Sequence, residues 1–334
     1  MAAPAGQAKS IEKTLTRPTG ANIYNPKKQD PEEQALWSAA QSNSGADRAD
    51  ALVQLSHMAH SRKDYAECLA LCESAMEIYE SLGDAIPSGE LAHVYTGISL
   101  SLSELDRNKE ALDFGSKAIQ ILEATDSSGL LSAYRNMGSF AFYAKDYADS
   151  ILWYTKALEY VSLGDPEIHK GWDHFYIARN LLRLFLNFKA EKHLLKARQI
   201  FKEAHQLRYM AFCDEDLSLV YARQKQAELA KTHAELAMDF AVTANEEMRI
   251  YWSNVRLGRA KYLLGDYLGA YGCYLEAKTW EVNNSNYTYW PHVFYIENCM
   301  ADCLDAIGNS EEAQEIRRRI NSLSESLGMD QEEI

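Results

Sequence analysis

The chain has 334 residues, with 34 Lys and Arg against 48 Asp and Glu, which gives a net charge of −14. Hydrophobic residues make up 47% of the chain and charged residues 25%, a balance typical of folded proteins in water. The negative charge repels phosphate backbones, so we expect no nucleic acid as a partner. No apolar run approaches the roughly 18 residues that span a bilayer, so we expect no membrane insertion.

The N-terminal segment, residues 1–48, differs in composition from the rest of the chain. Its first part, from Met1 to Pro31, holds four prolines, and five basic side chains against two acidic ones. This composition predicts a flexible basic tail. A short helix is expected near residues 32–41, with Pro31 in its first turn. At the other end, residues 324–334 predict an acidic tail.

The six cysteines show no spacing typical of a metal site. Cys68 and Cys72 are four positions apart, as are Cys299 and Cys303, which places each pair on one face of a helix. We therefore expect buried free thiols. Free thiols and the absence of an apolar signal segment at the N-terminus predict a reducing, cytoplasmic location.

One short phrase recurs along the chain. Asp-Tyr appears at Asp64, Asp146 and Asp266, each time followed by a helical pattern of small and aromatic residues. The separations are 146 − 64 = 82 and 266 − 146 = 120, both close to multiples of 40 or 41. A fixed period in this range predicts a repeat architecture, in which each unit buries its apolar face against its neighbours.

Helical spacing of apolar residues begins near position 49 and continues to position 323. We align the second helices of the repeats on a triplet of a small residue, a ring and an alanine, which is complete in Ser150, Tyr154 and Ala157. In the fourth repeat we assign this triplet to Ala197, Phe201 and Ala204. The pattern predicts seven helix pairs, near residues 49–80, 91–123, 131–161, 174–207, 211–241, 249–280 and 292–323.

Two of these units carry a family resemblance. The residues Met137-Gly138, Asp146-Tyr147, Ser150, Tyr154 and Ala157, with Leu257-Gly258, Asp266-Tyr267, Ala270, Tyr274 and Ala277, resemble the tetratricopeptide repeat. The repeat interval of about 41 is longer than the usual 34 and is similar to that of kinesin light chains and peptide-pheromone receptors. HEAT repeats share the interval, but the Gly and Ala-Tyr-Ala signatures favour the tetratricopeptide assignment.

The resemblance implies an all-α fold, a right-handed α-solenoid of about seven helix pairs over residues 49–323. It implies a non-catalytic adaptor or scaffold, without a cofactor, that binds an extended peptide or a partner protein in its concave groove. Two alternatives stay open, a peptide-sensing regulatory receptor and a structural subunit of a larger assembly. Neither the partner nor the oligomeric state follows from the sequence.

The first helices of such arrays line the groove, so the resemblance also implies which side chains face a ligand. Arginines among them suit carboxylates or the carbonyl groups of a peptide, because a guanidinium donates two parallel hydrogen bonds. The alternative is that these arginines pair with acids of neighbouring helices. The candidate binding residues are Arg135, Asn136, Arg179, Arg183, Trp252, Arg256, Arg259 and Asn298.

Two further features are weaker candidates. Tyr287, Tyr289 and Trp290 lie in a connection rich in aromatic residues, which predicts either an interface or packing inside the array. His57 and His60 lie one helical turn apart, with His93 on the next first helix. We expect them to form a polar surface and predict no metal site.

Overall fold

The computed structural model describes residues 30–83, 88–125, 129–160, 166–284 and 290–329, and every regular element in these residues is an α-helix. The predicted all-α fold is confirmed. The basic segment 1–29, Tyr287, Tyr289 and the acidic residues 330–334 lie outside the described ranges.

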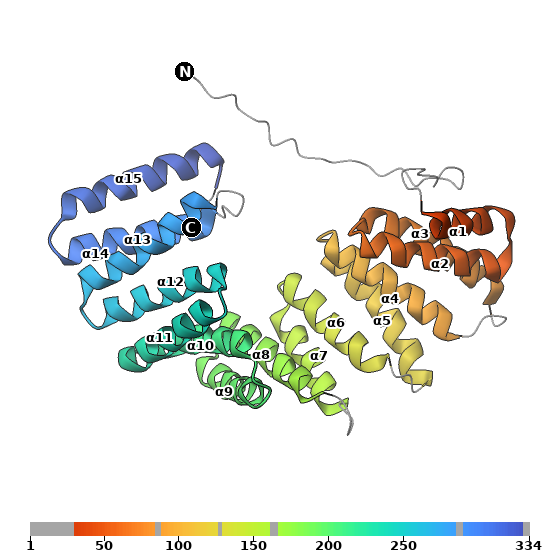
Figure 1. Cartoon of the computed structure of the whole chain (residues 1–334), viewed down its shortest axis with the longest axis horizontal. Helices are drawn as coiled ribbons and strands as arrows, with labels where there is room; N and C mark the ends of the chain where they lie inside the picture. The colour runs from red at the N-terminus through yellow and green to blue at the C-terminus, as the bar shows by residue number, and fades with distance from the viewer. Residues whose placement is uncertain (1–29, 84–87, 126–128, 161–165, 285–289, 330–334) are drawn as a thin grey trace, which may run out of the picture. The chain divides into compact units, whose positions relative to one another are not determined.

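The chain divides into two compact units, Met1–Thr125 and Asp126–Ile334. Unit 1 contains α1 (Pro31–Ser42), α2 (Gly45–Ser61), α3 (Tyr65–Leu82), α4 (Ser88–Glu104) and α5 (Asn108–Thr125). Unit 2 contains α6 (Leu130–Tyr143), α7 (Tyr147–Tyr160), α8 (Glu167–Arg183), α9 (Asn187–Glu203), α10 (Leu207–Arg223), α11 (Ala227–Thr243), α12 (Glu247–Leu263), α13 (Tyr267–Asn283), α14 (Trp290–Ala306) and α15 (Ser310–Leu327). Within each unit the helices follow one another as antiparallel neighbours (Figure 1).

The described helices form seven pairs, from α2–α3 to α14–α15, and α1 precedes them. Each pair turns sharply because one residue takes a left-handed backbone conformation, as at Lys145 between α6 and α7 (φ 64°). The following residue starts the second helix. Asp266 caps α13 in this way by accepting a hydrogen bond from the backbone N–H of Gly269 at 2.9 Å.

The small residues mark the places where the two helices of a pair meet. Ser150 on α7 donates a hydrogen bond to the carbonyl of Gly138 on α6 at 2.6 Å. A Cβ at Gly138 would lie 2.7 Å from the ring of Tyr154, so the glycine makes room for that ring. The same ring stacks on Tyr176 of the next pair, with centroids 5.2 Å apart. One tyrosine therefore packs on its own pair and on the next one, as solenoid packing requires.

From the third to the sixth pair the repeat period is constant. Gly138, Ala178, Ser218 and Gly258 are equally spaced (178 − 138 = 40), and all four are buried. The matching positions of α9 hold Ala190, Leu194 and Ala197, each 0% exposed.

The predicted triplet of the fourth repeat is therefore wrong. We assigned it to Ala197, Phe201 and Ala204, seven positions too late, and Ala204 follows the end of α9. A shift of two helical turns keeps the same helix face, so apolar periodicity alone did not distinguish the two assignments.

Most of the buried side chains in the described parts of both units are apolar. All six cysteines are free and buried. Among the described residues, no helix combines the length and the hydropathy that a membrane span requires.

Candidate functional site

Three arginines from successive first helices of unit 2 lie near one another. They are Arg183 at the end of α8, Arg223 at the end of α10 and Arg256 on α12, here called the arginine cluster. Partial burial is the largest cause of the lowered pKa of Arg223, and the charges of Arg256 and Arg183 lower it further. The pKa of His292 on α14 is lowered by the same causes. We call the surface around these four residues the inner face.

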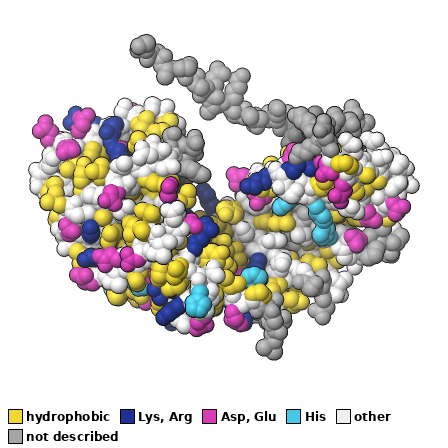
Figure 2. All heavy atoms as spheres, in the orientation of Figure 1, with side chains coloured by type: hydrophobic (Ala, Val, Ile, Leu, Met, Phe, Trp, Pro, Cys, Tyr) yellow, Lys and Arg dark blue, Asp and Glu magenta, His cyan; other side chains and the backbone are white. Residues whose placement is uncertain are grey.

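Four of the predicted arginines have no ion-pair partner among the described residues. Within the described part of the chain, Arg179, Arg183, Arg256 and Arg259 form no ion pair, and the buried Nε of Arg256 has no hydrogen-bond partner. In the view of Figure 2, Lys and Arg side chains lie beside hydrophobic ones over the region of α8, α10 and α12. Like charges held together without a paired counter-charge favour the binding of an anion.

Aromatic rings support the faces of these guanidinium groups. Arg256 lies over the ring of Trp252, with Cζ 5.8 Å from the centroid, and Trp252 in turn makes an edge contact with His292 at 4.7 Å. Arg259 lies 5.9 Å from the ring of Tyr262. A ring that covers the face of a guanidinium leaves its N–H edges available to a ligand.

Arg179 is held by two rings. Its Cζ lies 5.5 Å from the ring centroid of Phe142 and 5.8 Å from that of Phe175. Phe142 belongs to α6 and Phe175 to α8, so Arg179 spans two pairs. Its head is oriented by packing rather than by an ion pair.

Arg135 differs from the other predicted arginines. Its Nε and Nη2 donate to the carboxylate of Asp173 on α8 at 2.8 and 2.6 Å. Asp173 is only 1% exposed. The donors of Arg135 are thus largely engaged within the protein, which corresponds to the alternative in which an arginine pairs with an acid of the next helix.

Glu215 on α10 is buried close to the inner face and pairs with Arg249 of α12, whose Nη1 is 2.9 Å from Oε2. Burial raises the pKa of Glu215 to about 8, although Arg249, Arg256 and Arg179 act in the opposite direction. Its other oxygen, Oε1, has no hydrogen-bond partner among the described residues. Glu215 and Arg256 therefore each leave one buried polar atom unpaired on neighbouring first helices.

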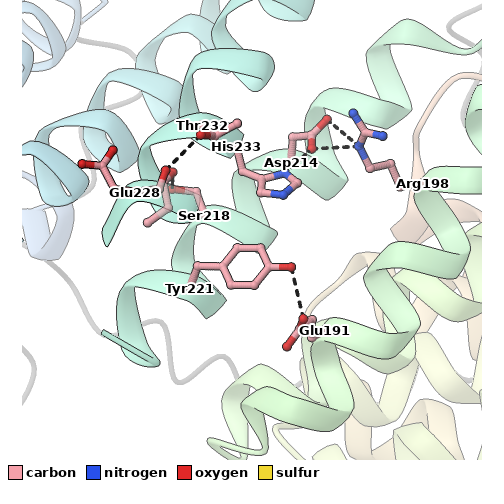
Figure 3. A network of polar contacts seen from close by, with 9 residues as sticks. Glu191, Arg198, Asp214, Ser218, Tyr221, Glu228, Thr232 and His233 are labelled. Carbon is pink, nitrogen blue, oxygen red and sulfur yellow. Dashed lines mark hydrogen bonds and ion pairs between the residues drawn. The ribbon is translucent and has the colours of Figure 1, made fainter. Parts of the chain in front are cut away.

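A separate polar network holds α9, α10 and α11 together (Figure 3). Asp214, which is 0% exposed, accepts a hydrogen bond from Nε of Arg198 at 2.8 Å, and Nδ1 of His233 lies 2.6 Å from the same oxygen. Tyr221 stacks on His233 and donates to Glu191 at 3.1 Å. Each of these side chains has a partner, so the network fixes the helix that carries Arg223 rather than offering a site of its own.

The remaining predicted residues lie on the first helices at both ends of unit 2. Asn136 on α6 and Asn298 on α14 are half-buried, and neither side chain forms a hydrogen bond to another described residue. Sequence reasoning missed Arg223, Arg249 and His292. Arg223 follows Arg183 by one repeat period (223 − 183 = 40), so the period itself carried the signal.

The aromatic connection before α14 is described only from Trp290 onward. Trp290 stacks on Phe294, with ring centroids 5.8 Å apart, and packs against the core formed with Ala301 and Leu304. Its ring therefore contributes to the packing of the last pair.

Unit 1 has a cavity of its own, of about 270 Å³, between α2, α3 and α4. His57, His60, His93, Cys68 and Cys72 are among its lining residues, and Nε2 of His57 lies 2.9 Å from Nε2 of His93. One imidazole donates to the other at this distance, which requires that at most one of them is charged. Among the described residues, no group of three or more His, Cys, Asp or Glu is arranged to hold a metal ion.

The comparisons with known proteins agree with this architecture. Residues 47–124 match the family model of the tetratricopeptide repeat. This match identifies tetratricopeptide repeats within residues 47–124, and the helix pairs of unit 2 have the same arrangement of two antiparallel helices. No curated protein sequence matches the chain.

Three solved structures share the fold at low sequence identity. One is a signal-transduction ATPase with numerous domains and a tetratricopeptide repeat sensor from Pyrococcus horikoshii, at a TM-score of 0.66 and 14% identity, which covers 89% of this chain and 44% of that protein. The second is the apo quorum sensor NprR from B. thuringiensis, at 0.66 and 14%, which covers 87% and 80%. The third is the Rap conjugation gene regulator of plasmid pLS20 in complex with the Phr* peptide, at 0.51 and 15%, which covers 86% and 77%. This chain thus spans less than half the length of the first of them.

Proposed function

We propose that the inner face of unit 2 binds an extended, acidic segment of a protein or peptide, and that the chain acts as a non-catalytic cytoplasmic adaptor. The observation that carries this proposal is the arginine cluster. Arg183, Arg223 and Arg256 come from three successive pairs, repel one another, and form no ion pair among the described residues. A bound carboxylate would relieve this repulsion and would accept a hydrogen bond from the unpaired Nε of Arg256.

The repeat supports an extended ligand rather than a compact one. Successive first helices present equivalent positions side by side, so a chain laid across them meets one helix after another. Arg179 and Arg259 occupy equivalent positions two repeats apart (259 − 179 = 80). The amides of Asn136 and Asn298 are suited to the backbone of such a segment, because each offers a donor and an acceptor.

Two of the similar structures are consistent with a peptide ligand. One is named a quorum sensor, and another is complexed with a peptide. These descriptions belong to those proteins, and at 14–15% identity they support the proposal only through the shared fold.

Selection from a random peptide display library against the intact chain tests the proposal. We expect enrichment of Asp and Glu, with affinities that fall as salt rises. The matched variants are Arg183→Ala with Arg256→Ala, and, as a control, Arg318→Ala on α15, where Arg318 is 69% exposed. Loss of each charged hydrogen bond should weaken the selected peptides about ten- to a hundredfold.

Two results would contradict the assignment. Selected peptides without acidic residues would show that charge is not what the face recognises. Equal affinity of the double variant and the Arg318→Ala control would place the binding site elsewhere on the chain. Circular dichroism and thermal unfolding of both variants should show an intact fold, since Arg183 and Arg256 form no ion pair among the described residues.

A second candidate function, peptide sensing, is favoured by one observation. Glu215 Oε1 on α10 and Arg256 Nε on α12 are both buried and unpaired in the described part of the chain. A short peptide that satisfies both atoms would tie two neighbouring pairs together and change their packing. A sensor of this kind should show a rise in the unfolding temperature and a changed small-angle scattering profile with a short peptide, whereas an adaptor should keep its profile.

A further inference from the structure

The turn between α8 and α9 exposes two phenylalanines and two leucines. Phe185 is 73% and Phe188 72% exposed, and Leu184 and Leu186 between and beside them are also exposed. We call residues 184–188 the apolar turn. Neither phenylalanine belongs to the buried core around α8 and α9 or packs against it. Side chains of this size in water are unfavourable unless something covers them.

Phe185 also adopts a backbone conformation that suits it poorly. Its φ is +58°, in the left-handed region that disfavours bulky residues. The constant repeat period shows what other turns place there. Lys145 and Lys225 hold the equivalent positions one repeat before and after (185 − 145 = 40), and Gly265 holds the next one; all three have positive φ. A large aromatic residue thus stands where these turns have a flexible cation or glycine.

The next residue departs from the pattern as well. Asp146 and Asp266 begin the second helices of their pairs and accept hydrogen bonds from the backbone N–H groups of Asp149 and Gly269. Leu186 occupies the same position before α9 and, like Gln226 before α11, gives no side-chain cap. The apolar turn therefore departs from two local preferences, those for a polar surface and for a small or flexible left-handed residue, and it also lacks the cap that Asp146 and Asp266 supply. Departures of this kind concentrate at sites selected for function.

We propose that the apolar turn is a docking site for a second protein, whose contacting segment combines apolar side chains with Asp or Glu. The charges around the turn carry the second half of this proposal. Arg183, Lys189, Lys192 and Arg223 are exposed and form no ion pair among the described residues. Arg223 lies over the ring of Phe185, with Cζ 4.9 Å from its centroid.

The same charges argue against two other occupants. If a second copy of this chain docked through the same patch about a two-fold axis, the cations of one copy would lie next to the same cations of the other and repel them. An anionic membrane would meet a chain with a net charge of −14, which opposes adsorption of the whole protein. An acidic protein segment is short enough to contact only the local cations around the turn, and salt screens its repulsion by the more distant acidic residues of the chain.

The experiment uses the neighbouring repeats to design its variants. Phe185→Lys with Leu186→Asp converts the turn to the Lys-Asp sequence found at Lys145 and Asp146. This variant should fold with an unfolding temperature at or above that of the parent chain, because it supplies a cap and relieves strain. The photoreactive residue p-benzoylphenylalanine replaces Phe188. In the matched control it replaces Glu228, the exposed equivalent position of the next repeat (228 − 188 = 40).

Both intact chains are photolysed in extract of the native source, and the cross-linked peptides are sequenced. We expect adducts at position 188 with a segment that contains apolar residues and Asp or Glu. Their yield should fall at least tenfold when Phe185→Lys and Leu186→Asp are added, and the control at position 228 should give none of them. Adducts with another copy of this chain or with lipid would overturn the proposal, as would equal yields at the two positions or the absence of adducts. The apolar turn and the inner face share Arg183 and Arg223, so the distinguishing variant is Arg256→Ala, which lies outside the apolar turn and its surrounding cations and should leave the cross-links unchanged.

Discussion

Arg135 of α6 and Asp173 of α8 form a bidentate ion pair, in which Nη2 lies 2.6 Å from Oδ2 and Nε 2.8 Å from Oδ1. The carboxylate is 1% exposed, so the pair is a buried tie between two successive first helices. Burial raises the pKa of Asp173, and the guanidinium of Arg135 opposes this shift.

Removal of the arginine of this pair should destabilise unit 2 more than removal of both members. Arg135→Met leaves an uncompensated buried carboxylate, and we expect a loss of about 3 kcal/mol in the free energy of unfolding. The double variant Arg135→Met with Asp173→Leu should recover most of this loss. Urea unfolding of the two single variants and the double variant measures the coupling energy. If Arg135→Met unfolds like the parent chain, the ion pair does not contribute to stability.

The close contact at Gly138 predicts opposite effects of the same substitution at two glycines. Gly138→Ala places a Cβ 2.7 Å from the ring of Tyr154, which is pinned by its stacking on Tyr176. Overpacking should exceed the helix-propensity gain of about 1 kcal/mol and give a net loss of about 1–2 kcal/mol. Gly272→Ala on α13 meets no atom within 4 Å and should instead stabilise the chain. Thermal unfolding of both variants checks the signs, and a stabilising Gly138→Ala would contradict the packing role of this glycine.

The histidine pair of α8 and α9 predicts a loss of stability in mild acid. Nδ1 of His174 lies 3.1 Å from Nδ1 of His193. Burial first, and then the charges of His193 and Lys196, lower the pKa of His174 from 6.5 to about 4. The unfolded chain takes up a proton at His174 near pH 6.5, whereas the folded chain takes it up only near pH 4. The free energy of unfolding should therefore decrease as the pH falls from 6.5 to about 4.

The expected loss attributable to His174 is about 1–2 kcal/mol between pH 7 and pH 4.5, because solvent around the half-buried ring screens part of the effect. Urea midpoints of His174→Gln across this range should show a shallower pH dependence than those of the parent chain. His169→Gln, at an exposed position on the same helix, is the control and should change the pH dependence less than His174→Gln does. Parallel curves for His174→Gln and the parent would show that the pair does not resist protonation.

The apolar turn predicts that substitutions toward the sequence of the other turns stabilise unit 2. Leu186→Asp restores the capping side chain seen at Asp266 and should raise the free energy of unfolding by about 1 kcal/mol. Phe185→Gly relieves the left-handed strain and should add a similar amount. Differential scanning calorimetry of the single variants gives the shifts. A lower unfolding temperature for Leu186→Asp would mean that the leucine side chain contributes packing that its exposure does not reveal.

The helix pairs followed from the sequence because they depend on local and periodic signals. Asp-Tyr at the turns, the small residues such as Gly138, and apolar spacing of three and four were sufficient to place seven pairs in the part of the chain that the structure describes. The register of α9 was not predictable in this way, because Phe201 is also fully buried and repeats the pattern further along the helix. The constant period of 40 residues assigns the small–ring–alanine positions of α9 to Ala190, Leu194 and Ala197. This period becomes clear only when several repeats are aligned together.

The inner face was only partly predictable. The expectation of arginines there followed from the repeat, and Arg183 and Arg256 lie near each other as required for a shared ligand. Whether an arginine finds an acid depends on residues far away in sequence. Arg135 meets Asp173 38 positions later, and Glu215 takes Arg249 34 positions later. Helix packing determines which acid lies near which arginine, and a local sequence pattern does not predict this packing.

The constant period has a further consequence where the two helices of a pair face each other. The same pair of positions holds a stacked Tyr134 and Trp153, then His174 with His193, then Asp214 with His233. An aromatic pair, a histidine pair and an Asp–His pair thus occupy equivalent positions in three successive helix pairs. The repeat therefore fixes where two side chains meet but leaves their chemistry free to differ from one pair to the next.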